Sequence, residues 1–183
     1  MKRICVFCGS HLGNDPAYAQ LAQQAAEAIV QAGFGIVYGG GSVGLMGIVA
    51  NAALASGGEV IGVIPQALAS TEIAHEGLTQ LHVVDTMHER KALMDDASDA
   101  FIALPGGFGT MDELCEVLSW RQLRIHDKPI GLLNHRGYYD ALLALFDSMV
   151  REGFIGPHTR RLLTDAPAIE ALLRTMFEAK TQP

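Results

Sequence analysis

Two glycine-rich segments and the charged residues near them are the parts of this sequence that could do chemistry. The first segment runs from Tyr38 to Gly47 and the second from Leu104 to Glu113. Glycine lets a backbone approach a ligand closely, and the start of a helix presents free N–H groups to an anion. Two such segments predict a pocket for a phosphorylated ligand. Because the second segment also carries the acid Glu113, the pattern favours a catalytic site over simple binding.

Glu113 has two interpretations that its spacing does not separate. Thr110 and Glu113 have the spacing of a capping box, in which the carboxylate would only accept a hydrogen bond from the backbone N–H of Thr110. The alternative is a catalytic carboxylate beside the ligand. Glu116, one turn further along the expected helix, could support Glu113 or face solvent.

Two cations, Arg90 and Lys91, open the helix that precedes the strand of the second segment. Cations near a helix N-terminus oppose the helix dipole, so their placement predicts an anionic partner such as a phosphate or a carboxylate. A solvated pair on the helix surface is the alternative. Glu89 follows Thr86 by three residues, which fits a capping box, and we expect Glu89 to be structural.

Other kinds of site are less well supported. The glycines at 39, 41 and 44 formally match the dinucleotide-binding fingerprint, but Glu59 lies too early to be the acid that the fingerprint needs at the end of the next strand. A nicotinamide-dependent oxidoreductase is therefore a distant alternative. Cys5 and Cys8 lie three residues apart in an expected strand, so they should point to opposite faces and cannot share a metal ion. We expect no metal and no cofactor.

Composition limits the class of protein. The 183 residues are 49% hydrophobic and 18% charged, with a net charge of −7. These values indicate a folded protein and argue against a nucleic-acid partner. We find no secretory signal and no apolar stretch long enough to cross a bilayer, and the three cysteines fit a reducing compartment. We therefore expect a cytoplasmic protein without a membrane partner, built as one domain over residues 1–183.

Strand-like and helix-like segments alternate along the chain. We expect strands at 3–8, 35–38, 60–64, 81–84, 101–104 and 130–133, helices at 16–32, 45–55, 86–97, 110–124, 138–151 and 166–179, and a loop at 66–80. This alternation predicts an α/β fold in which a doubly wound parallel sheet is covered by helices on both faces. Ligands in such folds bind beyond the carboxyl ends of the strands. Cys8-Gly9-Ser10 and both glycine-rich segments should share that rim.

The residues from Pro105 to Glu113, together with Met87 to Lys91, resemble the LOG (LONELY GUY) family of cytokinin riboside 5′-monophosphate phosphoribohydrolases. The similarity covers nearly the whole chain. It implies a Rossmann-like homodimer that hydrolyses the N-glycosidic bond of a nucleoside 5′-monophosphate, such as AMP, to the free base and ribose 5-phosphate. Family members often carry the label lysine decarboxylase, which fits poorly because a pyridoxal enzyme needs a Schiff-base lysine and a partner for the pyridine nitrogen.

The resemblance also implies that Arg90 and Glu113 are the catalytic pair. At Ser119 the family often has threonine, which keeps the hydroxyl. The substrate site that we expect comprises Ser10, Gly40, Gly41, Glu72, Arg90, Lys91, Gly106, Gly107, Phe108, Gly109, Thr110, Met111, Asp112, Glu113 and Ser119. The alternative function is a non-catalytic carrier of a nucleotide-like ligand or of the molybdenum cofactor, which would not need the Arg90–Glu113 pair.

Overall fold

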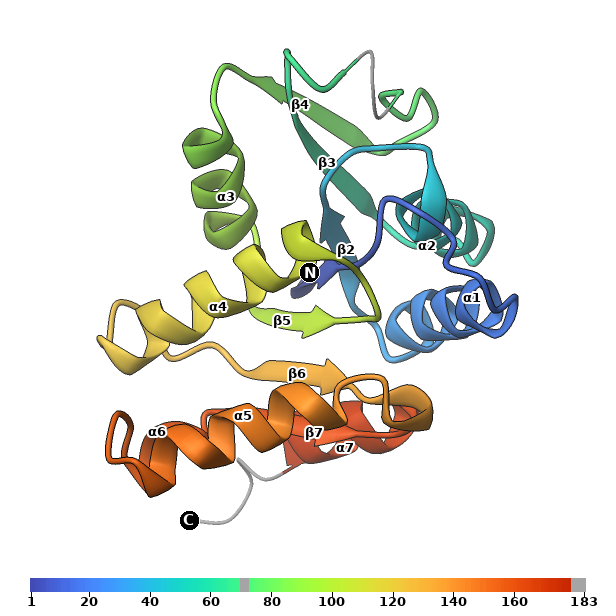
Figure 1. Ribbon diagram of the computed structural model, residues 1–183. Coiled ribbons are helices and arrows are strands. Elements are labelled where there is room, and N and C mark those ends of the chain that lie inside the picture. Colours follow the sequence, from blue (N-terminus) through green and yellow to red (C-terminus); the bar gives the residue numbers. More distant parts are fainter. Residues whose placement is uncertain (70–72, 179–183) are drawn as a thin grey trace.

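One parallel sheet organises the chain (Figure 1). The computed structural model describes residues 1–69 and 73–178, and within them the strand order is β4-β3-β2-β1-β5-β6-β7. The strands are β1 (Arg3–Phe7), β2 (Gly35–Tyr38), β3 (Val60–Pro65), β4 (Gln80–Val84), β5 (Ala100–Ala103), β6 (Ile130–Leu133) and β7 (Leu163–Ala166). All neighbouring strands are parallel. The predicted doubly wound α/β fold is confirmed.

Helices cover both faces of the sheet (Figure 1). One face carries α1 (Ala17–Gln31), α2 (Gly44–Ala55) and α7 (Ile169–Glu178). The other carries α3 (Met87–Asp96), α4 (Phe108–Gln122) and α5 (Asp140–Arg151), while α6 (Pro157–Arg160) and a 3-10 turn (His135–Gly137) lie in the connections of the last third of the chain. None of the helices in the described ranges is both long and apolar enough to cross a membrane.

The alternation of side chains along β1 explains why both faces are apolar. Ile4 and Val6 pack in the cluster under α1 and α2, whereas Cys5 and Phe7 pack in the cluster under α3 and α4. Cys8 lies in the first cluster. Cys5 and Cys8 therefore lie on opposite faces, as predicted from the period of two in a strand.

The central strands β1 and β5 mark the point where the chain changes direction across the sheet. From β1 the chain adds β2, β3 and β4 outward on one side, and then returns through α3 to place β5 on the other side of β1. Loops that leave the carboxyl ends of two such strands separate and open a crevice. The fold thus places the loops after Phe7 and after Ala103 around one hollow.

The end of the chain differs from the prediction. We expected a helix over 166–179 and no seventh strand, but Leu163–Ala166 forms β7 and α7 begins at Ile169. β7 is a four-residue edge strand with only its two end residues buried, so it has too little alternation to be recognised from sequence. The short helix α6 was also missed.

Candidate active site

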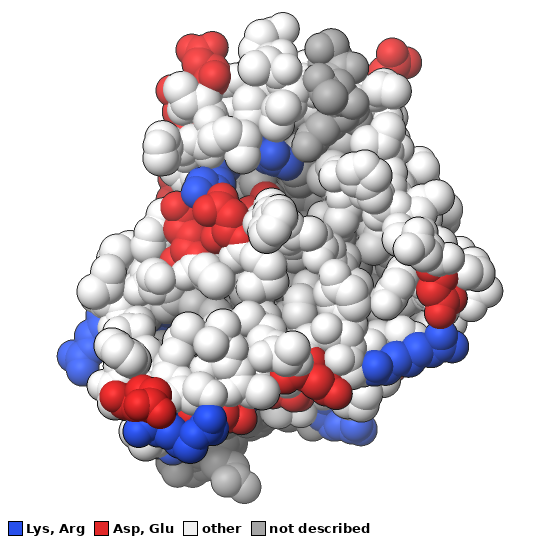
Figure 2. Space-filling view, viewed as in Figure 1, with Lys and Arg blue, Asp and Glu red and all other residues white. Residues whose placement is uncertain are grey.

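A cavity of about 480 Å³ opens at the carboxyl ends of β1 and β5. Its wall is formed by the loop from Cys8 to Gly13, the start of α2, Arg90 of α3, the segment from Pro105 to Thr110, and Glu113 of α4. Figure 2 shows the hollow, with acidic and basic side chains side by side over the region of α3 and α4. The cavity therefore lies at the crevice that this strand order predicts.

Arg90 lies in the first turn of α3 and is only 5% exposed. The helix starts with a capping box: the Thr86 hydroxyl accepts from the Glu89 N–H at 3.1 Å, and the Glu89 carboxylate accepts from the Thr86 N–H at 3.4 Å. The predicted structural role of Glu89 is confirmed. The guanidinium of Arg90 donates from Nη2 to the carbonyl of Gly39 at 3.1 Å. The alternative of a solvated surface pair is therefore wrong for Arg90.

The backbone of Gly39 lies directly against this arginine. A Cβ atom at position 39 would overlap the guanidinium of Arg90. The first glycine-rich segment thus serves the site by leaving room for a buried cation at the end of β2.

Glu113 lines the same cavity as Arg90. The helix that carries it begins at Phe108 with Gly107 as N-cap, two residues before the expected start. Thr110 therefore lies inside the first turn and cannot be the N-cap residue, so the capping-box interpretation of Glu113 is wrong. Glu113 thus borders the cavity together with the glycine turn.

The N-terminus of α4 has the features of an anion site. No side chain caps it, and none of its first-turn residues is acidic. The hydroxyl of Thr110 is buried in the cavity wall, and it has no hydrogen-bond partner among the described residues. A buried hydroxyl that lacks a partner costs free energy. Free helix N–H groups and this hydroxyl together point to an anionic ligand.

Lys91 connects α3 to α4. Its ammonium lies 3.2 Å from Asp112 Oδ2 and 3.0 Å from Glu116 Oε1. Burial alone would lower the pKa of Lys91, but the hydrogen bonds to Glu116 and Asp112 outweigh it and the pKa is raised. Arg90 precedes Lys91 in α3, and Glu113 follows Asp112 in α4. The ion pairs of Lys91 therefore join the two helices next to the candidate catalytic residues.

The structure brings most of the expected site residues into one wall. The cavity is lined by Ser10, Arg90, Gly106, Gly107, Phe108, Gly109, Thr110, Asp112 and Glu113. Lys91 does not line the cavity and instead forms its ion pairs with Asp112 and Glu116. Met111 packs into the core under α4. Ser119 borders a separate hollow of about 130 Å³ and donates to the Cys115 carbonyl at 2.8 Å. Glu72 lies outside the described residues.

The two glycines Gly40 and Gly41 are also outside the wall. The Gly40 carbonyl accepts from the His75 N–H at 3.0 Å, and Gly41 forms an isolated bridge with Ala74. Both are buried. Substrate contact stays a prediction for all of the expected residues, and these two glycines, Lys91, Met111 and Ser119 do not line the cavity.

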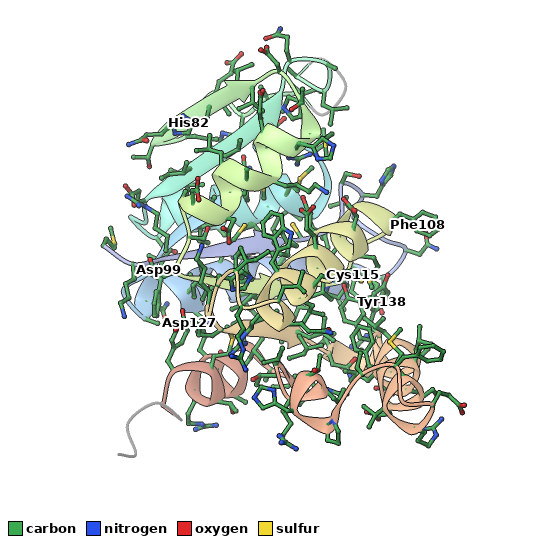
Figure 3. The ribbon with its side chains drawn as sticks, turned by 90° about the vertical axis from the view of Figure 1, so that its left-hand side faces the viewer. His82, Asp99, Phe108, Cys115, Asp127 and Tyr138 are labelled. Carbon is green, nitrogen blue, oxygen red and sulfur yellow. The ribbon has the colours of Figure 1, made fainter. Side chains whose placement is uncertain are left out.

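Several wall residues were not expected from sequence. Tyr18 of α1, Met46 of the first glycine-rich segment and Tyr138 after the 3-10 turn line the cavity, although none of them was among the expected site residues. Figure 3 shows Tyr138 at the same end of the molecule as Phe108, which projects outward and is 96% exposed. Burial, together with the charge of Glu113, raises the pKa of the Cys8 thiol, so this cavity thiol stays protonated. The part of the chain that the structure describes contains no group of His, Cys, Asp and Glu residues suited to a metal ion.

The comparisons with known proteins agree on one family. The family model described as "Possible lysine decarboxylase" matches residues 46–176. The chain is 55% identical over 174 residues to "Probable cytokinin riboside 5′-monophosphate phosphoribohydrolase LOGL1" of Oryza sativa subsp. japonica, covering 95% of this chain and 78% of that protein. It is 50% identical over 175 residues to "Cytokinin riboside 5′-monophosphate phosphoribohydrolase LOG1" of Arabidopsis thaliana, covering 96% and 82%. The chain belongs to the LOG family.

The fold of this LOG protein is also found in solved structures. The molybdenum cofactor binding protein of Rippkaea orientalis matches it with a TM-score of 0.73 over 99% of each chain, at 22% identity. At this identity the similarity shows a shared fold and nothing about ligands. Lys91 does not line the cavity and is paired with two carboxylates, so it is poorly placed to be the Schiff-base lysine that the lysine decarboxylase label requires.

Proposed function

We propose that this LOG protein hydrolyses the N-glycosidic bond of a nucleoside 5′-monophosphate and releases the free base and ribose 5-phosphate. The observation that carries the proposal is that Arg90, Glu113 and the uncapped start of α4 line one cavity. The printed names of the two relatives, which describe cytokinin riboside 5′-monophosphate phosphoribohydrolases, support the same reaction.

The 5′-phosphate of the substrate binds at the glycine turn in this proposal. The N–H groups of the first turn of α4 donate to the phosphate oxygens, and the positive end of the helix dipole favours the anion. Thr110 supplies the hydroxyl that has no partner among the described residues. Since the protein carries a net charge of −7, these local donors have to hold the phosphate against the overall charge.

Glu113 acts at the anomeric carbon. Breaking the bond between C1′ and the base nitrogen builds positive charge on the ribose, as in glycoside hydrolysis. A carboxylate beside C1′ stabilises that charge and accepts a proton from the attacking water. The water oxygen bonds to C1′, and the departing base takes up a proton.

Arg90 orients the substrate rather than donating a proton. A guanidinium is a poor proton donor in proteins. Burial and the hydrogen bond from Nη2 to the Gly39 carbonyl fix one end of the planar guanidinium group. A fixed cation at this position neutralises negative charge on the substrate or on the leaving base.

AMP and its N6-prenylated forms are the substrates that we propose. A volume of about 480 Å³ lies within the range of roughly 300–1,000 Å³ that is usual for small-molecule sites. We place the enzyme in the cytoplasm, because all three cysteines are free thiols, which fits a reducing compartment.

A homodimer is also part of the proposal. Helix α5 has no buried residue, although it carries Leu145, which is 52% exposed. Phe154, shortly after this helix, is 82% exposed. A second copy of the chain packed against α5 would cover these apolar side chains and explain their exposure.

The direct experiment incubates purified protein with AMP and with N6-isopentenyl-AMP and measures release of the free base by chromatography. We expect release from at least one of them and none from the corresponding nucleosides at equal concentration, because the nucleosides lack the phosphate. Folded protein that releases base from neither nucleotide contradicts the proposal. Tight nucleotide binding without turnover would favour a carrier function instead.

A further inference from the structure

Three consecutive carbonyl groups in the second glycine-rich segment are each held by a different donor. The Leu104 carbonyl accepts from the Tyr139 hydroxyl at 2.7 Å, and the Pro105 carbonyl accepts from the Gly9 N–H at 3.2 Å. The Gly106 carbonyl accepts from the Tyr138 hydroxyl at 2.8 Å. We call these three hydrogen bonds the carbonyl brace.

The brace fixes the direction of the amides that follow. In a trans peptide the C=O and the next N–H lie in one rigid plane and point in opposite directions. Holding the Pro105 carbonyl therefore sets the Gly106 N–H, and holding the Gly106 carbonyl sets the Gly107 N–H. Glycine has no side chain to restrict it, so these planes would otherwise turn freely. Both glycines line the cavity, and Gly107 is the N-cap of α4.

The two tyrosines are themselves held firmly after β6. Tyr139 is buried, and its backbone N–H donates to the side-chain carbonyl of Asn134 at 2.8 Å. The Asn134 amide in turn donates to Asp140 at 2.8 Å. The rings of Tyr138 and Tyr139 meet edge to face at 4.8 Å, and the ring of Tyr18 meets Tyr138 edge to face at 5.7 Å. Both hydroxyls are thus placed by packing that does not involve the substrate.

We propose that Tyr138 and Tyr139 are positioning residues, whose hydroxyls aim the amides of the glycine turn at the 5′-phosphate. This inference rests on the proposed function for the identity of that anion. In this inference the loop after β6 contributes to the affinity for phosphorylated ligands. It does not contribute to the step that breaks the N-glycosidic bond. Tyr138 is the better one to test, because its side chain is partly exposed and its loss should not empty the core.

The test compares Tyr138→Phe with wild type by calorimetric titration of ribose 5-phosphate and by steady-state kinetics with AMP. Loss of one hydroxyl releases the Gly106 carbonyl. We expect the Kd for ribose 5-phosphate and the KM for AMP to rise about fivefold to tenfold. We expect kcat to change less than about twofold, since the affected amides contact the phosphate equally before and during the reaction. Tyr139→Phe should act in the same direction, with a loss of thermal stability as well.

The matched control is Thr175→Val, which removes another hydroxyl that donates to a backbone carbonyl, here that of Ala171 on α7 at 3.0 Å. It should leave Kd and KM unchanged. A wild-type Kd in Tyr138→Phe, a fall in kcat with unchanged KM, or a wild-type protein that binds no ribose 5-phosphate would overturn the inference. If wild type releases no base but Tyr138→Phe still weakens ribose 5-phosphate binding, the proposed function fails and the brace stands.

Discussion

At the scale of single residues, Glu113 is the side chain on which the proposed chemistry depends. We expect Glu113→Gln to lower kcat for base release by about 100-fold or more, because the amide can neither stabilise the ribosyl cation as an anion nor accept the water proton. Ribose 5-phosphate binding should change little, since the proposed phosphate donors are backbone N–H groups and the Thr110 hydroxyl. Stopped assays and calorimetric titration measure the two quantities.

Glu170→Gln is the matched control, because Glu170 is exposed in the first turn of α7. It should keep the wild-type kcat. A Glu113→Gln protein that turns over at the wild-type rate would remove Glu113 from the mechanism.

The sequence predicted some of these residues well and others not at all. The resemblance to the LOG family, which rests on the motifs at 87–91 and 105–113, implied that Arg90 and Glu113 share one site, and both line the same cavity. The bridge from Lys91 to Asp112 and Glu116 could not be predicted, because it joins two helices whose relative position depends on the packed sheet. Gly137-Tyr138-Tyr139 belongs to the similarity with the LOG family, but Tyr138 was not among the expected site residues, because its place in the cavity depends on the order of the strands.

At the scale of elements, His126 fastens the connection between α4 and β6. Its Nε2 donates to the Val117 carbonyl at 3.0 Å, and its Nδ1 accepts from the Lys128 N–H at 3.2 Å. The neutral ring satisfies both partners, whereas a protonated ring would set a second N–H against that of Lys128. Burial lowers the pKa of His126, helped by the charges of Lys128 and Arg121 and opposed by Asp95 and the Val117 carbonyl.

This arrangement predicts a stability that depends on pH. The folded pKa lies below the unfolded value of 6.5, so the unfolded chain binds the proton more readily. The contribution of His126 is complete above that value and is lost as the pH falls toward the folded pKa. We expect His126→Ala to lower the unfolding free energy by about 1–3 kcal/mol at neutral pH, with a smaller effect in mild acid.

Urea denaturation at two pH values measures both effects. His82→Ala is the control, because His82 is exposed on the edge strand β4 (Figure 3) and its loss should leave the pH dependence unchanged. An unfolding free energy of the His126→Ala protein that falls as steeply in acid as that of wild type would exclude His126 as the cause.

Element boundaries were predicted where glycine, proline or a capping box marks them. The bounds of β2 and β6 and the capping box of α3 agree with the structure. The start of α4 was placed two residues late, because Thr110 and Glu113 imitate a capping box while a glycine, Gly107, is the actual N-cap. The sequence allows either Thr110 or Gly107 as the N-cap of α4. Only the packing of the turn against β1 decides between them.

At the scale of the whole molecule, the exposed apolar face of α5 predicts association. We expect light scattering to give twice the chain mass of 19.6 kDa. Leu145→Glu should shift the protein toward the monomer, because it places a charge where the partner would exclude water. Val83→Glu, an exposed apolar residue on β4 at the far edge of the sheet, should keep the dimer. A wild-type mass of one chain at micromolar concentration would contradict the homodimer.

The global fold was predictable because alternation of strands and helices leaves few arrangements open. The resemblance implied a homodimer, but its interface could not be read from the sequence, since an exposed leucine on α5 has the same sequence pattern as a buried one on α1.

The contact between Gly39 and Arg90 also limits how this protein can change. A side chain at position 39 would meet the end of the Arg90 guanidinium, although 51 positions separate the two residues along the chain. A substitution at the glycine therefore forces the tip of the arginine side chain to move, and such a shift would lower activity in the proposed mechanism. Random mutagenesis under selection for base release should therefore favour glycine at position 39 together with arginine at position 90.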